Sequence, residues 1–503
     1  MHATVETATL LGIDAVPVEV QVDVSSGIPA FTIVGLGDAA VLEARERVRS
    51  AIRRCGFDFP GARVVVNLAP APLRKHGTGF DLPIAAAILV ATGQLQRNLL
   101  ESAVLVGELS LDGSVRSVPG MLAQARSAQA RRLRLIGPSG ILRYRAALSD
   151  LDAQPIDTLR DLLQRCAETP CPRIDAPAPR KCFPDLADIV GQSSAKRALE
   201  IAATGGHHVL FTGPPGTGKS MLAHAMCGIL PALDTDEAIA TALVHSVAGA
   251  DETAALAGVR PFRAPHHSAT IAGLLGGGSP PRPGEVCLAH NGVLFLDELP
   301  EFAPSALQSL RQPLEEGSVT LVRADARIAF PARFTLIAAA NPCPCGYLGD
   351  SQRRCTCAES TISRYRARVG GPLMDRMDIS VDVPRIDPSF LLRTHSSETS
   401  SVVASRVLEA RQRAISRNAS LDESIGTLPR GRLRQHIALS RLSATASEAL
   451  ASCARVGHLS GRAVVRLVSV ARTIADLESS ADVLRPHILE ALGYRTWDTD
   501  AAA

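Results

Sequence analysis

Aromatic side chains are scarce in this chain: they make up 3% of its 503 residues, with a single tryptophan. Aromatic rings are the usual platform on which proteins stack the bases of a single nucleic-acid strand. Their scarcity argues against such stacking, so a nucleic acid bound here would be held by its backbone. The formal net charge of +3 neither indicates nor excludes this partner, because a basic stripe can lie within a nearly neutral total.

The sequence also lacks long apolar runs and a secretion signal. The apolar stretch LPIAAAILVAT, residues 82–92, is too short to span a bilayer, so we expect no membrane partner. The opening residues MHATVETATLLGIDAV have neither the basic head nor the long apolar stretch of a signal peptide. Eleven cysteines is an odd count, and we expect a cytoplasmic protein whose clustered thiols serve metal binding or catalysis rather than disulfides.

The chain is too long for one ordinary core, and its pattern changes along its length. An N-terminal α/β pattern, with β-rich segments such as ARVVVNLAP (62–70), precedes a second α/β unit. Near the C-terminus, SGRAVVRLVSVARTIADLE predicts an amphipathic helix with Ser460 as its N-cap. The expected fold class is α/β, with domains at residues 1–166, 186–384 and 385–503, the last of them helical, and a proline-rich linker at residues 167–185.

The segment HHVLFTGPPGTGKS is an apolar strand followed by a glycine-rich turn. Glycines let the backbone N–H groups and the next helix N-terminus surround a β-phosphate, while Lys219 supplies charge to the phosphates and Ser220 a hydroxyl to Mg²⁺. A glycine-rich turn that binds nothing is the alternative, and the motifs that follow in order argue against it. We therefore predict that ATP and Mg²⁺ bind at Gly213, Pro214, Pro215, Gly216, Thr217, Gly218, Lys219 and Ser220.

Two further apolar strands end in polar residues suited to hydrolysis. NGVLFLDELPEF contains Asp297, which is expected to hold Mg²⁺, and Glu298, which is expected to polarise the attacking water. Alone, this segment is a buried strand with a solvated acidic end, but its position after the Lys219 turn favours a hydrolytic pair. RFTLIAAAN ends in Asn341, which is expected to orient the same water.

Two arginines are candidates for contact with the γ-phosphate. Arg376, in GGPLMDRMDI, would reach the nucleotide of a neighbouring subunit and balance charge in the transition state. A surface ion pair with Asp375 or Asp378 is the alternative. Arg462, at the start of the C-terminal amphipathic helix, would reach the same phosphate from a helical lid, with a solvated charge at a helix end as the alternative.

Seven segments carry a resemblance to a known family: FTGPPGTGKS, VHSVAG, RPFRAPHHSATIAGLLGGG, PGEVCLAHNGVLFLDELPEF, NPCPCGYLGD, GPLMDRMDI and SGRAVVRLVSVARTIADL. Together they resemble the AAA+ ATPases, and more closely the magnesium-chelatase-like ATPases of the competence protein ComM (YifB) family. The resemblance implies an AAA+ core with a helical lid, assembled as a ring, in this family a hexamer. It further implies action on branched or single-stranded DNA, with branch migration as one activity. A protein-remodelling or magnesium-chelatase-type motor is the alternative.

The N-terminal domain is similar to the Lon-type peptidase domain, an α/β fold of the ribosomal S5 type. KHGTGFDLPIAAAIL and LVGELSLDGSVRSVPGMLAQA resemble its two active-site segments, which supply a serine nucleophile and a lysine base. Here Gly79 stands at the serine position and Ala123 at the lysine position, while Lys75 and Ser110 lie elsewhere. We therefore expect no peptidase activity and interpret the domain as a collar for oligomerisation or substrate docking.

Four cysteines are concentrated in NPCPCGYLGDSQRRCTC, whose other residues are not core formers. Two C-x-C pairs supply four thiolates, the ligand set of a structural zinc site with no open position. An iron–sulfur cluster is the alternative that this spacing leaves open, and free thiols are a weaker one. Zinc would stiffen the segment between Asn341 and Arg376, so the cluster is predicted to be structural. Its ligands are Cys343, Cys345, Cys355 and Cys357.

Two segments are expected to project from the core, and the resemblance to AAA+ motors of the chelatase and replicative-helicase type implies that they point into the pore of a ring. SVTLVRADARIAF, residues 318–330, predicts a hairpin, for which a solvated charged turn is an equally good interpretation. Residues 260–285 form a glycine-rich insertion containing His266 and His267, for which a hydrogen-bonded pair is at least as good an interpretation as metal ligation. The expected DNA contacts are Arg323, Arg327, Arg260 and Arg263.

Overall fold

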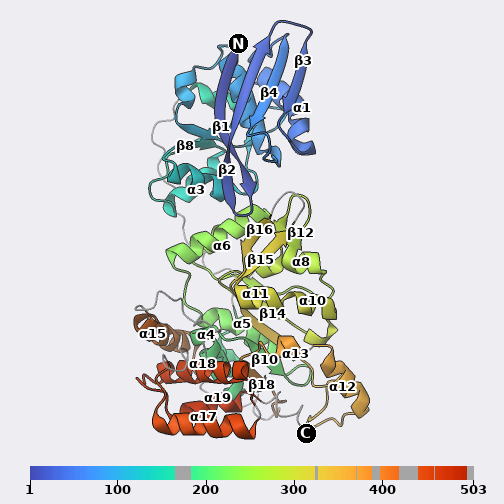
Figure 1. The fold of residues 1–503 in the computed structure, drawn as a ribbon, viewed down its shortest axis with the longest axis vertical. Coiled ribbons are helices and arrows are strands. Elements are labelled where there is room, and N and C mark those ends of the chain that lie inside the picture. Colours follow the sequence, from blue (N-terminus) through green and yellow to red (C-terminus); the bar gives the residue numbers. More distant parts are fainter. Residues whose placement is uncertain are drawn as a thin grey trace.

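The computed structural model describes residues 1–164, 183–322, 327–369, 371–387, 397–418, 440–457 and 459–495. Along the long axis of the molecule lie an N-terminal α/β part, a central α/β part and a C-terminal group of helices (Figure 1). The α/β fold class predicted from the sequence is confirmed. No helix within the described ranges combines the length and the apolar character needed to cross a membrane. Of the predicted linker, residues 183–185 lie inside these ranges.

The N-terminal part is built on a seven-stranded sheet in the order β3-β4-β2-β1-β5-β8-β9. β1 and β2 pair as an antiparallel hairpin, whereas β5, β8 and β9 extend the sheet in parallel. Burial alternates along β4, as expected for a strand with one face on a core. The strands are β1 (His2–Leu11), β2 (Asp14–Ser25), β3 (Ala30–Val34), β4 (Arg63–Ala69), β5 (Ala103–Leu105), β8 (Arg134–Gly137) and β9 (Ala153–Pro155).

Helix α2 (Asp81–Ala91) fills the centre of this part. All its residues except Val90 are buried, because the helix is apolar on nearly every side. Its one carboxylate, that of Asp81, is satisfied by Arg47 of α1 (Ala39–Arg54) at 2.6 Å. This part also contains α3 (Met121–Ala130) and a small hairpin of β6 (Glu108–Leu109) and β7 (Val115–Arg116).

The central part is built on a five-stranded parallel sheet in the order β11-β14-β17-β10-β18. Along β10, β14 and β17 every residue is buried, and alternate residues belong to two separate apolar clusters, one on each face. The carboxyl ends of these strands therefore lie at one edge, where ligands bind in such sheets. The strands are β10 (Val209–Thr212), β11 (Phe262–Arg263), β14 (Val293–Leu296), β17 (Thr335–Ala340) and β18 (Ile379–Asp382).

Helices and short hairpins complete the central part. Helices α4 and α5 contribute to the cluster on one face, and α9, α10 and α11 to the cluster on the other. The helices are α4 (Ser193–Gly205), α5 (Lys219–Ile229), α6 (Thr235–Ala248), α7 (Thr253–Leu256), α8 (Ile271–Leu275), α9 (Glu285–Leu288), α10 (Pro304–Ser309), α11 (Arg311–Glu316), α12 (Glu359–Ala367) and α13 (Gly371–Met374). The hairpins are β12 (Gly276–Gly277) with β13 (Arg282–Pro283) and β15 (Ser318–Val322) with β16 (Arg327–Pro331).

The C-terminal helices pack on the face of the central sheet that α4 and α5 cover. Helix α18 begins at the predicted N-cap, where the Ser460 hydroxyl accepts the N–H of Ala463 at 3.2 Å. Leu467 and Val468 on its apolar face are buried in the shared cluster. The helices are α15 (Ser400–Asn418), α17 (Ala444–Val456), α18 (Gly461–Leu477) and α19 (Arg485–Gly493).

The N-terminal and central parts share a buried apolar cluster. It brings together Leu122 of α3 and Leu243 of α6, both with no exposed surface. Backbone bonds support the junction: Gly120 N–H donates to the carbonyl of Ser246 at 2.8 Å, and Leu122 N–H donates to the Ser246 hydroxyl at 3.3 Å. The two parts are therefore packed against each other rather than merely tethered.

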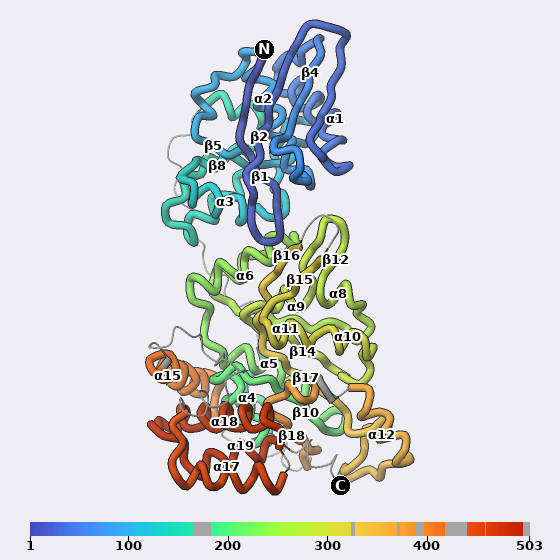
Figure 2. The backbone as a smooth tube through the Cα atoms, in the orientation of Figure 1, coloured from blue at the N-terminus to red at the C-terminus, as the bar shows by residue number. Residues whose placement is uncertain are grey.

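The turn between β1 and β2 contacts the β15–β16 hairpin of the central part (Figure 2). A Cβ added at Gly12 would lie 3.1 Å from Cγ2 of Ile328, and the φ of +68° at Gly12 also favours glycine. Leu10 and Ile13, on either side, pack against the cluster that contains Ile328. The outer strand pairs of the hairpin, those farthest from α11, are thus supported by the N-terminal part.

We predict that Leu243→Ala weakens the junction between the two parts. A buried Leu→Ala change loses apolar contacts and leaves a cavity, so the free energy of unfolding should fall by about 2–5 kcal/mol. Chemical denaturation followed by circular dichroism measures this loss. The matched control is Leu408→Ala on α15, where the side chain is 46% exposed and little change is expected. An equal loss in both variants would contradict the prediction.

Candidate nucleotide-binding site

The glycine-rich loop joins the end of β10 to the start of α5. Gly216 and Gly218 have positive φ angles of 76° and 91°, which other residues rarely adopt. Gly213 has no room for a side chain, because an added Cβ would lie 2.2 Å from the carbonyl oxygen of Val383. The predicted loop residues therefore form a tight turn before the N-terminus of α5, a geometry suited to phosphate binding.

The Lys219 ammonium group lies inside this turn, and 8% of the residue is exposed. It donates to the carbonyl oxygens of Gly213 at 2.6 Å and Pro214 at 2.8 Å, and to Oδ1 of Asn341 at 3.2 Å. Burial lowers the pKa of Lys219 to about 8, and the charge of Asp297 opposes this shift. The loop thus encloses a cation whose hydrogen-bond acceptors are uncharged oxygens. The oxygens of a bound phosphate would replace them.

Ser220 and Asp297 face each other across the edge of the sheet. The Ser220 hydroxyl donates to Oδ2 of Asp297 at 2.9 Å, linking the first turn of α5 to the residue after β14. Both residues are exposed, and a hydroxyl beside a carboxylate is the oxygen donor set that Mg²⁺ takes near phosphates. These two residues fit the predicted magnesium site.

Glu298 follows Asp297 in a left-handed backbone conformation, with φ +52°. Its N–H donates to Oδ1 of Asp297 at 2.9 Å, and its side chain is 56% exposed. Nδ1 of His267 lies 3.4 Å from its Oε2. Sequence reasoning missed this contact, since it considered His267 only as part of a structural pair or as a metal ligand.

The structure gives Arg376 a partner within its own chain. The residue is 7% exposed, and its guanidinium group pairs with Glu315 of α11. This partner is neither of the two aspartates considered from the sequence. Arg376 would therefore have to exchange Glu315 for a nucleotide in order to act on a neighbouring subunit.

Arg462 and Arg466 occupy the first turns of α18 and differ in burial. Arg462 is exposed, as either sequence interpretation requires. Arg466, one turn further, is 8% exposed and lies 3.7 Å from Asp378, just before β18. This buried pair, which the sequence analysis did not find, ties the C-terminal helices to the central sheet.

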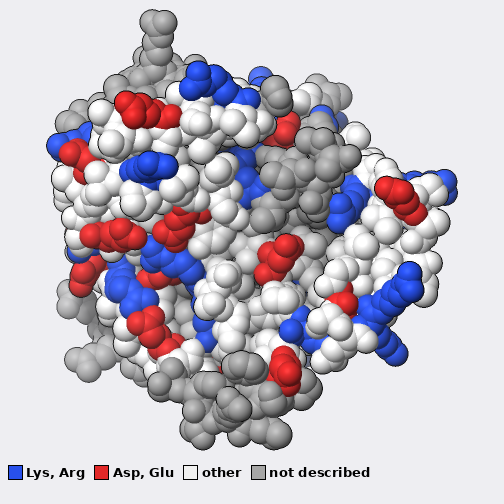
Figure 3. Space-filling view, turned by 90° about the horizontal axis from the view of Figure 1, so that it is seen from below, with Lys and Arg blue, Asp and Glu red and all other residues white. Residues whose placement is uncertain are grey.

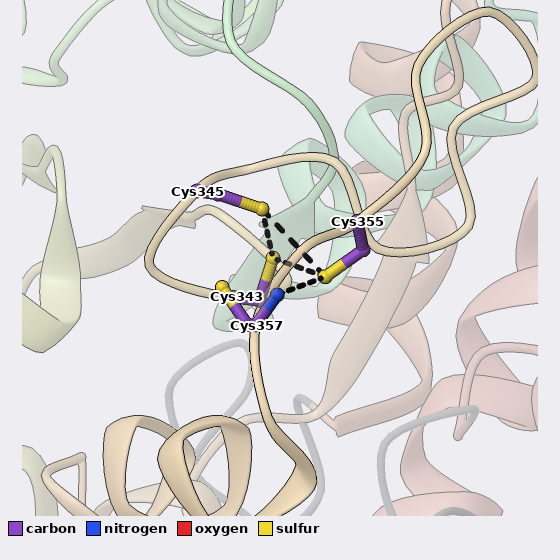
Figure 4. A group of neighbouring side chains, drawn as sticks. All are labelled: Cys343, Cys345, Cys355 and Cys357. Atoms are coloured by element: carbon purple, nitrogen blue, oxygen red, sulfur yellow. Dashed lines mark hydrogen bonds between the residues drawn. The ribbon is translucent and has the colours of Figure 1, made fainter.

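The four clustered cysteines come together as predicted (Figure 4). Their sulfur atoms all lie within 4.8 Å of one another, with Cys343 and Cys345 3.3 Å apart and each 3.6 Å from Cys355. A tetrahedral zinc with Zn–S bonds of about 2.3 Å requires sulfur atoms about 3.8 Å apart. The cluster therefore fits a structural metal.

The cysteine loop also contacts the phosphate loop. Gly346, with φ +83°, lies so close to Pro215 that an added Cβ would be 2.8 Å from its Cδ. On the other side, Arg385 pairs with the buried carboxylate of Asp350 at 3.1 Å. The sequence placed the cluster between Asn341 and Arg376, and the structure shows that it also borders the glycine-rich turn.

Two of the four arginines expected to contact DNA have carboxylate partners in the chain. Arg260 pairs with Glu237 at 2.7 Å and donates to backbone carbonyls. Arg263 makes two hydrogen bonds to Glu285, at 2.7 and 2.6 Å. These bonds hold the insertion to the core, and each arginine would have to exchange its carboxylate partner for a phosphate in order to contact DNA.

The other two arginines belong to the β15–β16 hairpin. Arg327 is exposed at the start of β16 and pairs in register with Val322, which is 71% exposed. Arg323 lies outside the described residues. Figure 3, seen from the end that carries the C-terminal helices, shows basic side chains among acidic ones rather than a uniform basic field. Within the described part of the hairpin, Arg327 at the start of β16 thus presents an exposed arginine.

The residues at the peptidase positions are those of a packed core. A Cβ added at Gly79 would meet Val106 and Val118 at 3.4 Å, and Ala123 is 3% exposed. Lys75 has no exposed surface, and its ammonium group donates to the carbonyl of Pro70 at 2.5 Å. Neither position presents a nucleophile or a base.

Family comparisons cover all three parts of the molecule. The profile for "Magnesium chelatase, subunit ChlI" matches residues 185–391, that for "Subunit ChlI of Mg-chelatase" matches residues 20–139, and that for the ChlI C-terminal region matches residues 397–495. DNA helicase MCM8 of Xenopus laevis is 28% identical over 254 residues, which is 50% of this chain and 27% of that protein.

Two full-length relatives extend this result. YifB of Salmonella typhimurium is 42% identical over 502 residues, 99% of this chain and 97% of its own. Competence protein ComM of Haemophilus influenzae is 41% identical over 98% of this chain and 97% of its own. The chain therefore belongs to the magnesium-chelatase-like AAA+ ATPases of the ComM and YifB type.

Proposed function

We propose that this protein hydrolyses ATP and works as a ring-shaped motor on DNA. One observation carries the hydrolytic part: Lys219, the Ser220–Asp297 pair and Asn341 meet at the carboxyl edge of one parallel sheet. These residues come from distant segments, and their types are those that phosphoryl transfer to water requires. Membership of an AAA+ ATPase family supports the same activity.

In the proposed reaction, water attacks the γ-phosphate of ATP, and ADP leaves. Lys219 transfers its hydrogen bonds from neutral carbonyls to phosphate oxygens, which are stronger acceptors because they are charged. Glu298 polarises the water and Asn341 orients it. Ser220 and Asp297 would hold Mg²⁺, which when bound neutralises charge on the phosphates.

The proposal includes a ring in which each site is completed by the next subunit. Arg376 would exchange Glu315 for the γ-phosphate of the neighbour, and the exposed Arg462 would approach it from the helical lid. A hexamer is the expected assembly for this family. In this scheme, residues 1–166 form a collar, residues 186–384 the ATPase core and residues 385–503 the lid.

Three substitutions should separate the roles within the ATPase site. Lys219→Ala should weaken ATP binding, whereas Glu298→Gln should bind ATP and barely hydrolyse it. Arg376→Ala should bind ATP normally yet lose turnover, by about 10³–10⁵-fold if it acts as an arginine finger. Equilibrium binding and phosphate release distinguish these outcomes.

Mixed rings test whether Arg376 acts on the neighbouring subunit. In a ring that mixes Arg376→Ala chains with Lys219→Ala chains, some sites combine Lys219 of one chain with Arg376 of its neighbour. These sites are intact, so part of the activity should return. An absence of rescue in rings shown to assemble would count against an arginine supplied by the neighbour.

We further propose that the four cysteines hold one structural zinc. The sulfur spacing supports this. We also propose a reducing cytoplasmic location, where clustered thiols serve metal binding rather than disulfides. Because Gly346 borders Pro215, the metal would brace the phosphate loop as well as the segment leading to Arg376.

Loss of the metal should weaken nucleotide binding. Cys355→Ser combined with Cys357→Ser should abolish one equivalent of zinc per chain in elemental analysis. ATP affinity should then fall, because the cysteine loop no longer supports the phosphate loop. The control is Cys453→Ser, a half-buried cysteine on α17 outside the cluster, which should change neither quantity. Full metal content in the double variant would exclude these ligands.

The DNA-acting part of the proposal is supported by an exposed arginine of the β15–β16 hairpin and by the comparisons. Arg327 is exposed on the hairpin, and part of the chain is similar to a protein named as a DNA helicase. A motor must release its track in each cycle, so unspecific contacts with phosphates suit it better than stacked bases. A chelatase or protein-remodelling motor is the second candidate, because the matching family is named after magnesium chelatase.

DNA stimulation of ATP hydrolysis discriminates between these candidates. Replacing Arg323 and Arg327 by alanine should leave basal hydrolysis nearly intact while abolishing stimulation by forked, four-way or single-stranded DNA. Wild-type binding should weaken with salt, with a log–log slope of about −0.7 to −0.9 per phosphate contact. If the double variant kept full stimulation by DNA, the hairpin would not be the segment that contacts DNA.

A further inference from the structure

The end of the cysteine loop and helix α12 carry a local excess of positive charge. Between residues 351 and 368 the chain contains five arginines and one acidic residue, Glu359. In Figure 1, α12 lies toward the end of the central part that is farther from the β15–β16 hairpin. A local excess of one sign of charge attracts ligands of the opposite sign, so this segment is a candidate surface for an anion.

Burial shows which side of α12 faces the solvent. Tyr365 is 6% exposed and Val369, one turn further, is 3% exposed, so these two residues mark the packed side. Arg364 and Arg368 are exposed and lie on one face, because residues four apart are neighbours on a helix. Ser360, one turn before Arg364, is exposed as well. This row of hydroxyl and guanidinium groups consists of residue types that bind phosphate oxygens.

Several of these arginines have charge available for a ligand. Arg354 and Arg364 are exposed and have no carboxylate partner within the described part of the chain. Arg353 is exposed too, and its guanidinium group donates to the hydroxyl of Tyr347 at 2.6 Å and lies 4.9 Å from the centroid of that ring. Because tyrosine is an uncharged partner, it holds the Arg353 side chain in place without neutralising it.

The surface lacks the apolar anchors of a protein interface. Among the described residues, no large apolar side chain between residues 341 and 369 is exposed. Protein–protein interfaces are centred on buried aromatic or aliphatic anchors, and charged residues are depleted there. A phosphate backbone instead requires positive charge and hydrogen-bond donors. The composition of this surface therefore favours a nucleic acid over a second copy of the chain.

We infer that the exposed arginines of the cysteine loop and α12 bind the phosphate backbone of DNA, as a contact additional to the β15–β16 hairpin. This inference rests on the proposed action on DNA. Arg354 and Arg364 supply the uncompensated charge. The surface also adjoins the ATPase site, because Arg368 lies 3.7 Å from Glu301, three residues after Glu298. DNA held here would contact a helix that is linked to the segment carrying the proposed hydrolytic glutamate.

The test measures binding of fluorescently labelled duplex and single-stranded DNA to the full-length protein at several salt concentrations. Arg354→Ala combined with Arg364→Ala removes two phosphate contacts. The log–log slope of affinity against salt should therefore become shallower by about 1.8 for duplex DNA and about 1.4 for single-stranded DNA. The loss should be the same for DNA of different sequences, since phosphates carry no base information. An unchanged slope and affinity would overturn the inference.

The matched control is Arg455→Ala combined with Arg485→Ala, which removes the same charge from exposed positions on α17 and α19. It should leave the slope unchanged, and an equal loss in both pairs would overturn the inference, because net charge alone would then explain it. Arg354→Lys combined with Arg364→Lys should keep most of the affinity, since an ammonium group binds phosphate as a point charge. Lysines that bind as weakly as the alanine pair would also overturn it.

Two further readouts separate this inference from the proposed function. ATP hydrolysis without DNA should be equal in the alanine pair and in wild type, because neither arginine belongs to the ATPase site. A loss of this turnover with DNA binding retained would assign the arginines to the nucleotide site and overturn the inference. Wild-type protein that binds neither form of DNA would instead overturn the proposed action on DNA. Thermal unfolding of each variant checks that the fold is intact, and the lysine pair provides the comparison where the alanine pair does not fold.

Discussion

Burial of the Lys219 ammonium group constrains the geometry of the whole nucleotide site. A buried cation must be satisfied, and the carbonyls of Gly213 and Pro214 and the side chain of Asn341 meet this need. The partners come from the end of β10 and the residue after β17, so the loop, α5 and two neighbouring strands must keep their mutual positions. The cysteine loop adds a further restraint, because Gly346 presses on Pro215.

The sequence predicted the fold class and the Ser460 cap because these depend on local pattern. Alternation of β-rich and helical segments indicates an α/β protein, and a serine before an amphipathic run indicates a helix start. The burial of Leu122 and Leu243 in one shared cluster could not be predicted in this way. Periodicity shows that a helix has an apolar face but not which distant surface covers it.

At the candidate site, motif spacing placed Lys219 and Ser220 on one turn, and the ends of apolar strands pointed to Asp297 and Asn341. Partner choice among charges was harder to predict. The pairing of Arg260 with Glu237 was not predicted, because long side chains reach many acids and only tertiary structure selects one. The contact of His267 with Glu298 could not be inferred from strand pairing, because β11 ends at Arg263, before His267.

Because Gly12 contacts Ile328, the N-terminal sheet restrains movement of the β15–β16 hairpin. The β1–β2 hairpin runs through the seven-stranded sheet, and its turn packs against Ile328 near the outer end of the β15–β16 hairpin. A displacement of Ile328 toward the N-terminal part would therefore press on the seven strands as well as on the short helix α11. A displacement in the opposite direction would separate packed apolar side chains, which costs dispersion and hydrophobic free energy. The contact therefore couples the hairpin to the N-terminal sheet in both directions.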